Sequence, residues 1–231
     1  MAKGVEPELE MKNAFLISIL LVLVQSGHAQ GFVNLDFEDA VITQDSNPHE
    51  VNASDAIPAW TAYINGVPQT DIIYDTINLD SAGISIHDTS TDYFPPLQGN
   101  YSIFLQGDNN ADPINYPAFT KSASIGQYGQ VSPIAKSMTF YGYNLVRFQL
   151  TFNGINIPYY PVGSEANYTI YGADISADAG QTGQLVFTAL YNGGGILDNI
   201  QFSQSSVPEP SEFALVTMGT LLLSFCRRRR C

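Results

Sequence analysis

The chain has 231 residues and carries 22 acidic against 9 basic side chains, a net charge of −13. Such an acidic chain repels phosphate backbones, so nucleic acid is a poor candidate partner. The two cysteines, Cys226 and Cys231, lie at the C-terminal end. The rest of the chain therefore has no disulfide, zinc–thiolate site or thiol nucleophile.

The first 29 residues have the pattern of an export signal. Lys12 precedes an apolar run from Ala14 to Val24, and small residues lead up to Ala29. The run is shorter than the ~20 residues that span a bilayer, which favours a signal peptide over a membrane helix. We expect cleavage after Ala29. Because residues 1–10 carry three glutamates, the wrong charge for an export signal, we also expect translation to begin at Met11.

Residues 30–206 are predicted to fold as one β domain with 17 acidic and 3 basic side chains, a net charge of −14. Short stretches rich in Val, Ile, Phe, Tyr and Thr alternate with clusters of Gly, Asn, Asp and Pro, which is typical of strands and turns. We expect strands at Val33–Phe37, Trp60–Ile64, Ile84–His87, Tyr101–Gln106, Ala123–Gln127, Ser137–Tyr143, Arg147–Phe152, Tyr168–Asp174, Gly183–Ala189 and Gly195–Phe202.

These strands indicate an all-β fold, a two-sheet antiparallel β-sandwich of the jelly-roll kind. The alternation of Phe148, Leu150 and Phe152 places one face of a strand inward. Asn153-Gly154 suits the positive φ angles of a type I′ turn and predicts a hairpin. Two helices are expected outside this domain: an N-terminal signal helix and a short C-terminal hydrophobic helix.

The C-terminal segment, residues 207–231, has three ordered parts. Pro208-Glu209-Pro210 keeps the chain extended and accessible to a protease. An apolar run from Phe213 to Cys226 follows. The segment then carries a stop-transfer signal whose arginines stay on the cytoplasmic side of a membrane, namely Arg227, Arg228, Arg229 and Arg230. In order and position these parts resemble the PEP-CTERM sorting signal of Gram-negative bacteria.

The resemblance implies a partner and a destination. In that family an exosortase-type membrane protease recognises the tail and cuts near the Pro-Glu-Pro motif, and the product reaches the cell surface or an extracellular polysaccharide matrix. The tail then enters the membrane at least transiently. A largely apolar run of 14 residues is short for a stable anchor, which favours a sorting segment. An ordinary tail anchor is the alternative.

A second resemblance concerns the edges of the domain. Asn34-Leu35-Asp36-Phe37-Glu38 opens it, and the segment from Ile196 to Phe202 closes it. Both look like the first and last strands of galactose-binding-like jelly rolls, which lie side by side and often hold a structural Ca²⁺ near the seam. The resemblance makes Glu38 and Asp198 the possible calcium ligands, since calcium binds carboxylate oxygens. The alternative is that both carboxylates accept hydrogen bonds from loop amides.

Sugar binding requires exposed aromatic faces beside amides and carboxylates. Tyr159 and Tyr160 lie between two prolines and are the most loop-like pair, and Trp60 is the one tryptophan. Packing of the rings into the core is the competing interpretation. The full set of candidate aromatic residues is Trp60, Tyr63, Tyr93, Tyr141, Tyr143, Tyr159 and Tyr160.

Catalytic signatures are missing from the sequence. Gly83–His87 departs from the G-x-S-x-G motif at its last position. A glycosidase needs two carboxylates at a set separation, and an acidic chain always offers pairs. We therefore expect a non-enzymatic, exported protein of the cell surface or extracellular matrix, with a structural or adhesive role and no required cofactor. The alternatives are a carbohydrate-binding module of the exopolysaccharide matrix and a secreted hydrolase.

Overall fold

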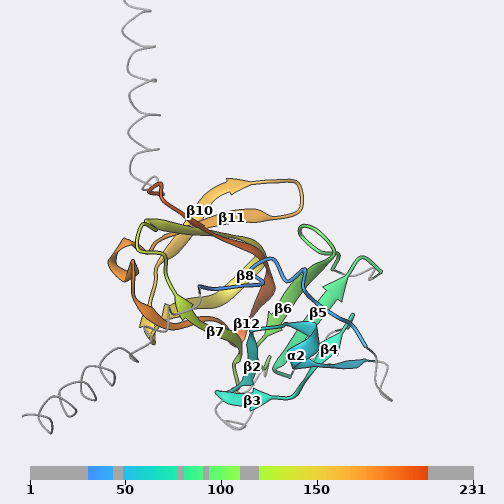
Figure 1. The fold of residues 1–231 in the computed structure, drawn as a ribbon. Helices are drawn as coiled ribbons and strands as arrows, with labels where there is room; N and C mark the ends of the chain where they lie inside the picture. The colour runs from blue at the N-terminus through green and yellow to red at the C-terminus, as the bar shows by residue number, and fades with distance from the viewer. Residues whose placement is uncertain (1–30, 44–48, 77–80, 91–93, 110–119, 208–231) are drawn as a thin grey trace, which may run out of the picture. The chain divides into compact units, whose positions relative to one another are not determined.

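The computed structural model describes residues 31–43, 49–76, 81–90, 94–109 and 120–207 (Figure 1). The expected signal peptide, the Pro208-Glu209-Pro210 motif and the arginine tail lie outside these ranges. Within the described ranges, no helix has the length and apolar character needed to cross a membrane.

Strands dominate the described chain, and the predicted all-β class is confirmed. Twelve strands are hydrogen-bonded into one continuous sheet, accompanied by a single helical turn, α2 (Ala53–Ala56), and a 3₁₀ turn, η2 (Ser176–Asp178). The strands are β1 (Glu50–Asn52), β2 (Thr61–Ile64), β3 (Val67–Gln69), β4 (Asp71–Tyr74), β5 (Gly83–Asp88), β6 (Tyr101–Gln106), β7 (Ala123–Gln130), β8 (Ser137–Phe152), β9 (Ile155–Asn156), β10 (Tyr159–Ser164), β11 (Thr169–Asp174) and β12 (Thr182–Ser203).

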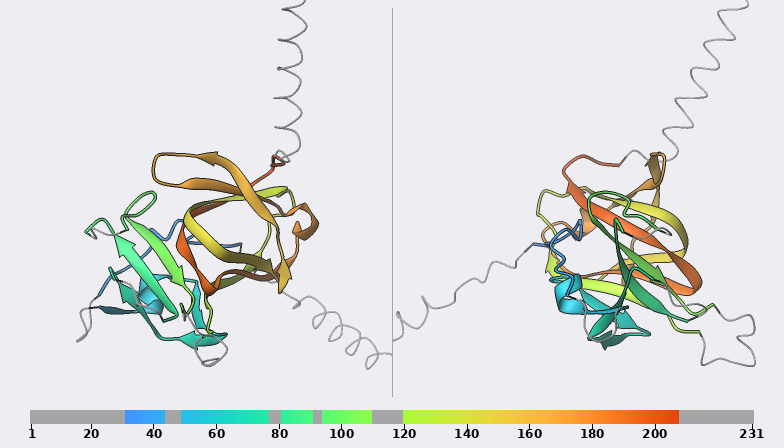
Figure 2. Two further views of the ribbon diagram at one scale, coloured as in Figure 1. Left: turned by 180° about the vertical axis from the view of Figure 1, so that it is seen from behind. Right: turned by 90° about the vertical axis from the view of Figure 1, so that its right-hand side faces the viewer.

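The two longest strands, β8 and β12, pass through both layers of the sandwich (Figures 1 and 2). The first half of β12 lies between β7 and the second half of β8. Its second half lies between β6 and the first half of β8. Between the halves, Asn144 and Asn192 have left-handed φ angles of 52° and 55°, and the pairing of the two strands shifts register. Such irregularities bend a strand, so one sheet folds over on itself.

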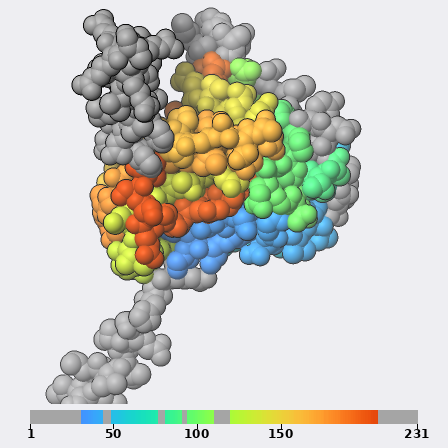
Figure 3. Space-filling view, turned by 90° about the horizontal axis from the view of Figure 1, so that it is seen from above, coloured from blue at the N-terminus to red at the C-terminus, as the bar shows by residue number. Residues whose placement is uncertain are grey.

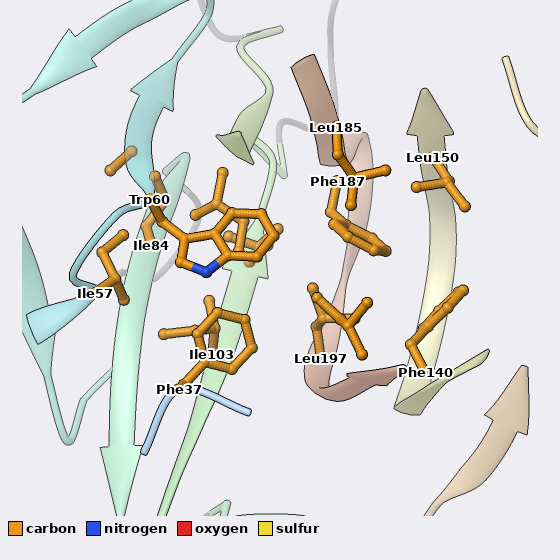
Figure 4. Close-up of a cluster of buried hydrophobic side chains, with 14 of the residues drawn as sticks. Phe37, Ile57, Trp60, Ile84, Ile103, Phe140, Leu150, Leu185, Phe187 and Leu197 are labelled. Atoms are coloured by element: carbon orange, nitrogen blue, oxygen red, sulfur yellow. The ribbon is translucent and has the colours of Figure 1, made fainter. Parts of the chain in front are cut away.

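Apolar side chains from both layers meet in one core (Figure 4). Trp60 and Phe37 pack with ring centroids 5.7 Å apart, and Trp60 also contacts Phe187 across the core at 6.3 Å. Strands β5 and β6 contribute Ile84 and Ile103, both almost fully buried. The core therefore fixes which face of β5, β6, β8 and β12 points outward.

Several predicted strands agree with the structure, and others merge. Tyr101–Gln106 coincides with β6, whereas the predicted pairs Ser137–Tyr143 with Arg147–Phe152, and Gly183–Ala189 with Gly195–Phe202, each form one long bent strand. The predicted hairpin is confirmed, because Asn153 and Gly154 have φ angles of 49° and 76° between the paired strands β8 and β9. One pair, β4 with β5, is parallel and departs from the expected antiparallel order.

The strand predicted at Val33–Phe37 is wrong. Asn34 and Phe37 have φ angles of 47° and 59°, which turn the chain and place the Phe37 ring in the core. The segment nevertheless lies beside the last strand, since the Ile200 N–H donates to the Leu35 carbonyl at 2.9 Å. The first and last segments of the domain therefore lie side by side as predicted, but residues 33–37 do not form the predicted strand.

Candidate ligand-binding groove

A groove crosses the outer face of the sheet where β5, β6, β12 and β8 run side by side. It consists of two adjoining hollows of about 360 and 290 Å³. The larger is lined by Phe94, Phe104, Gln106, Gly107, Asn109, Tyr143, Asn144, Val146, Asn192, Gly193, Gly194, Gly195 and Ile196. The smaller is lined by Phe94, Pro95, Leu97, Tyr143, Ala166, Asn167 and Ile196.

Strand register explains how the aromatic floor forms. Phe104 on β6 lies opposite Ile196 on β12, which lies opposite Tyr143 on β8. Residues directly opposite in antiparallel strands share one face of the sheet. Their chain neighbours, including Ile103 and Leu197, point into the core. This alternation puts one row of large side chains on the outer face of three strands.

The row of rings is extended and supported by neighbouring aromatic groups. Phe94 stacks on Phe104 with ring centroids 5.5 Å apart and an interplanar angle of 7°. The imidazole of His87 lies against both rings at 6.0 and 5.9 Å. Burial lowers the pKa of His87, so the neutral imidazole supports the rings. Tyr143 is 46% exposed and presents its ring to solvent.

Amide side chains surround this floor. Asn144 and Asn192 sit at the left-handed bends of β8 and β12, and both are exposed. Asparagine tolerates this conformation better than most residues. Asn109 follows β6 and Asn167 precedes β11, both also exposed. The groove thus combines flat apolar rings with groups that both donate and accept hydrogen bonds.

The groove carries no charge on its described lining. Among the residues that line the two hollows, none is a carboxylate, an imidazole, a lysine or an arginine. In the space-filling view of Figure 3, the surface of β10 and β11 (orange) borders the green surface of residues 81–90 and 94–109. Asn167, which precedes β11, lines the smaller hollow together with Pro95 and Leu97.

One wall of the groove is the loop 94–100, and Asp198 anchors it from below. The carboxylate of Asp198 is fully buried and accepts hydrogen bonds from Gln98 N–H at 2.9 Å and Ser102 Oγ at 2.8 Å. It also accepts one from Asn199 N–H at 2.6 Å. Leu97 N–H in turn donates to Ser102 Oγ at 2.9 Å. Burial raises the pKa of Asp198 to about 7, Glu38 shifts it in the same direction, and the hydrogen bonds oppose the shift.

Glu38 anchors the other end of the same loop. Its Oε1 accepts from the N–H groups of Asn100 and Tyr101 at 2.7 and 3.1 Å, and its Oε2 accepts from Asn100 Nδ2 at 2.7 Å. Gly99 has a φ angle of 67°, and a Cβ there would collide with the Glu38 carboxylate. Any other residue at position 99 would strain the backbone and displace this carboxylate.

The two predicted calcium ligands are thus brought to one loop, where both carboxylates accept hydrogen bonds from N–H and O–H donors. Within the described ranges, no group of three or more His, Cys, Asp or Glu side chains is gathered. Calcium at Glu38 and Asp198 stays a prediction.

The three residues predicted to contact sugar, Trp60, Tyr159 and Tyr160, do not line the groove. Trp60 is only 4% exposed and its Nε1 donates to the Asn34 carbonyl at 2.8 Å, so its ring is part of the core and is not a surface platform. Tyr159 and Tyr160 lie in strand β10 and not in a loop, and both are half-buried. Tyr159 Oη donates to the Phe148 carbonyl at 2.8 Å, and burial raises its pKa to about 12.

Of the candidate aromatic residues in the sequence, Tyr143 lies in the groove. Sequence reasoning missed Phe94 and Phe104, which form the stacked pair. The alternation in Tyr101–Gln106 could have placed Phe104 on the face opposite Ile103 and Leu105. Nothing in the sequence pattern alone indicates that Phe94 folds over it.

Comparison with known proteins identifies no family. No protein-family model matches the sequence, and no curated protein matches it. A solved structure of the enzymatically active domain of tailspike protein 4 from bacteriophage CBA120 is 12% identical with a TM-score of 0.37, and the match covers 63% of this chain and 19% of that one. The carbohydrate-binding module TmCBM27, described for specific mannan recognition, is 10% identical with a TM-score of 0.33. The match covers 70% of this chain and 96% of that one. The chain spans about a fifth (19%) of the length of the tailspike chain that it matches.

Proposed function

We propose that this chain is an exported, non-catalytic surface protein whose β-sandwich binds carbohydrate in the groove. The observation that carries the proposal is the lining, in which aromatic rings lie among amides without any charged side chain. A sugar ring has apolar C–H faces and polar hydroxyl edges. Aromatic faces suit the former, and amides, which donate and accept, suit the latter.

A hydrolytic role is less well supported by the geometry. Glycoside hydrolysis requires two carboxyl groups flanking the bond that is cut. Asp198 has the raised pKa that a general acid needs, yet it is fully buried beneath the loop 94–100 and its oxygens bind that loop. Among the described residues, no carboxylate lines either hollow. The Asp198 carboxyl group therefore holds the wall of the groove.

Sorting by an exosortase-type protease to the cell surface or matrix is the second part of the proposal. The packed domain continues up to the residue before the Pro208-Glu209-Pro210 motif. Ser137 Oγ donates to the Ser205 carbonyl at 2.7 Å, and Val207 lies against Gly172. Cleavage near the motif would leave these contacts intact, which supports a tail that is separable from the binding domain.

The sorting proposal is tested by intact mass. We would express the chain in a Gram-negative host with a matching exosortase and measure the mass of the surface-exposed product. A product that ends between Pro208 and Ser211 is expected. The variant Pro208→Ala/Pro210→Ala should stay unprocessed, and the same host without the exosortase is the control. A surface product that retains Arg227–Arg230 would reduce the tail to a membrane anchor.

The binding proposal is tested by affinity electrophoresis through gels that contain uncharged polysaccharides such as glucan, mannan or xylan. We expect retardation in at least one gel, unchanged chain length of the polysaccharide, and loss of retardation in Tyr143→Ala. The matched control is Tyr128→Ala, which removes a 72% exposed tyrosine on β7 outside the groove lining. Shortening of the polysaccharide would instead reveal a hydrolase.

A further inference from the structure

The two hollows of the groove are parts of one binding surface. Phe94, Tyr143 and Ile196 line both of them, so the two hollows adjoin at these three side chains. Their volumes, about 360 and 290 Å³, each lie near the lower end of the range for small-molecule sites. Together they offer room for more than one sugar ring, with the shared aromatic residues at the junction.

The hollows differ in chemistry along this line. The larger one is bordered by Asn109, Asn144 and Asn192, whose amides offer several donors and acceptors. The smaller one has a single amide, Asn167, beside apolar side chains that include Leu97. A ligand with hydroxyl groups at one unit and an apolar ring face at the next would satisfy both hollows at once.

Charge restricts the ligand further. The domain between Gln30 and Ser206 has a net charge of −14, and no cation lines the described groove. A uronate, sulfate or phosphate group would meet repulsion from the whole domain without a local partner. An uncharged polysaccharide meets no such electrostatic repulsion when it binds.

We propose that the groove binds an internal stretch of an uncharged linear polysaccharide, with consecutive sugar units in the two hollows and the Phe94–Tyr143 pair between them. This inference rests on the carbohydrate binding proposed above and adds the ligand's charge, minimum length and mode of binding. An interior stretch fits because aromatic rings and at least one amide line each hollow, so each hollow can hold one of two consecutive sugar units. The chain ends then lie beyond the groove and are not recognised.

The test is a length series by isothermal titration calorimetry on the full-length chain in a non-denaturing detergent. The probes are gluco-, manno- and xylo-oligosaccharides of one, two, four and six units, and oligogalacturonates as anionic counterparts. For the neutral series that binds, affinity should rise at least tenfold from one unit to four. Methyl capping of the reducing end should leave it unchanged, and oligogalacturonates should not bind.

Two variants locate the binding. Tyr143→Ala, which alters the shared junction, should lower the affinity for the tetrasaccharide at least tenfold, whereas Asn167→Ala should lower it for the tetrasaccharide and leave the single sugar unaffected. Tyr128→Ala is the control, and thermal unfolding midpoints verify that each variant is folded.

Each contrary result has one meaning. A single sugar that binds as tightly as the tetrasaccharide, or loss of binding on end capping, overturns interior binding while leaving carbohydrate binding in place. Tighter binding of oligogalacturonates overturns the preference for uncharged chains. Absence of binding to every probe overturns both this inference and the function on which it rests.

Discussion

The buried carboxylate of Asp198 should make the stability of the protein depend on pH. Burial raises its pKa to about 7 from the ordinary value of 3.8. Between these values the folded chain keeps a proton on Asp198 that the unfolded chain has released, so stability falls as the pH rises through this window. A shift of about 3 pKa units corresponds to about 4 kcal/mol, at about 1.36 kcal/mol per unit.

Asp198→Asn removes this titration while preserving the size of the side chain. The free energy of unfolding of the variant relative to the wild type should therefore increase by about 3 kcal/mol between about pH 4.5 and about pH 8. Urea unfolding at five pH values, followed through the fluorescence of Trp60, measures this difference. His87 titrates with the opposite sign because burial lowers its pKa, but it is present in both proteins and cancels.

A difference that stays constant within about 0.5 kcal/mol over this range would refute the reasoning, because it would mean that folding does not change the pKa of Asp198. Asp55→Asn, at an exposed position in α2, controls for the loss of one negative charge.

Three further outcomes are expected. Trp60→Ala should lower the free energy of unfolding by about 3–5 kcal/mol, measured by circular dichroism in urea, since it leaves a core cavity; Tyr128→Ala should change it by less than about 0.5 kcal/mol. Gly99→Ala should lower the free energy of unfolding by about 1–3 kcal/mol in the same assay, because φ is 67° and the added Cβ would meet the Glu38 carboxylate. The same variant should bind oligosaccharide more weakly in calorimetry. Gly154→Ala, with a φ of 76° and open space around it, should cost only about 1 kcal/mol and leave binding unchanged.

The sequence predicted those parts of the fold that depend on local chemistry. Asn153-Gly154 forms the expected turn because few other residue pairs adopt two positive φ angles in succession. Tyr101–Gln106 forms the expected strand because its side chains alternate between two environments. The strand expected at Val33–Phe37 failed because burial of the Phe37 ring required a turn that its apolar pattern does not reveal.

The groove could not be predicted in this way, since it depends on contacts between distant segments. Phe104, Ile196 and Tyr143 share a face only through the register of three strands. The backbone N–H of Gln98 and the Asp198 carboxylate that it contacts are 100 positions apart in the chain. Resemblance identified Asp198 and Glu38 as a pair, but only the structure shows that both bind one loop.

The position of Asp198 links the stability of the fold to the shape of the groove. Its strand, β12, also supplies Ile196 to the groove lining, while its carboxylate holds the loop that forms the wall. A carboxyl group beneath the loop can accept hydrogen bonds from several backbone groups without facing the ligand, so the lining needs no carboxylate of its own. Hydrogen bonds from Gln98 to Asp198 and from Asn100 and Tyr101 to Glu38 therefore hold the loop. Changes in either carboxylate should consequently alter binding through the wall, even though neither residue lines the hollows.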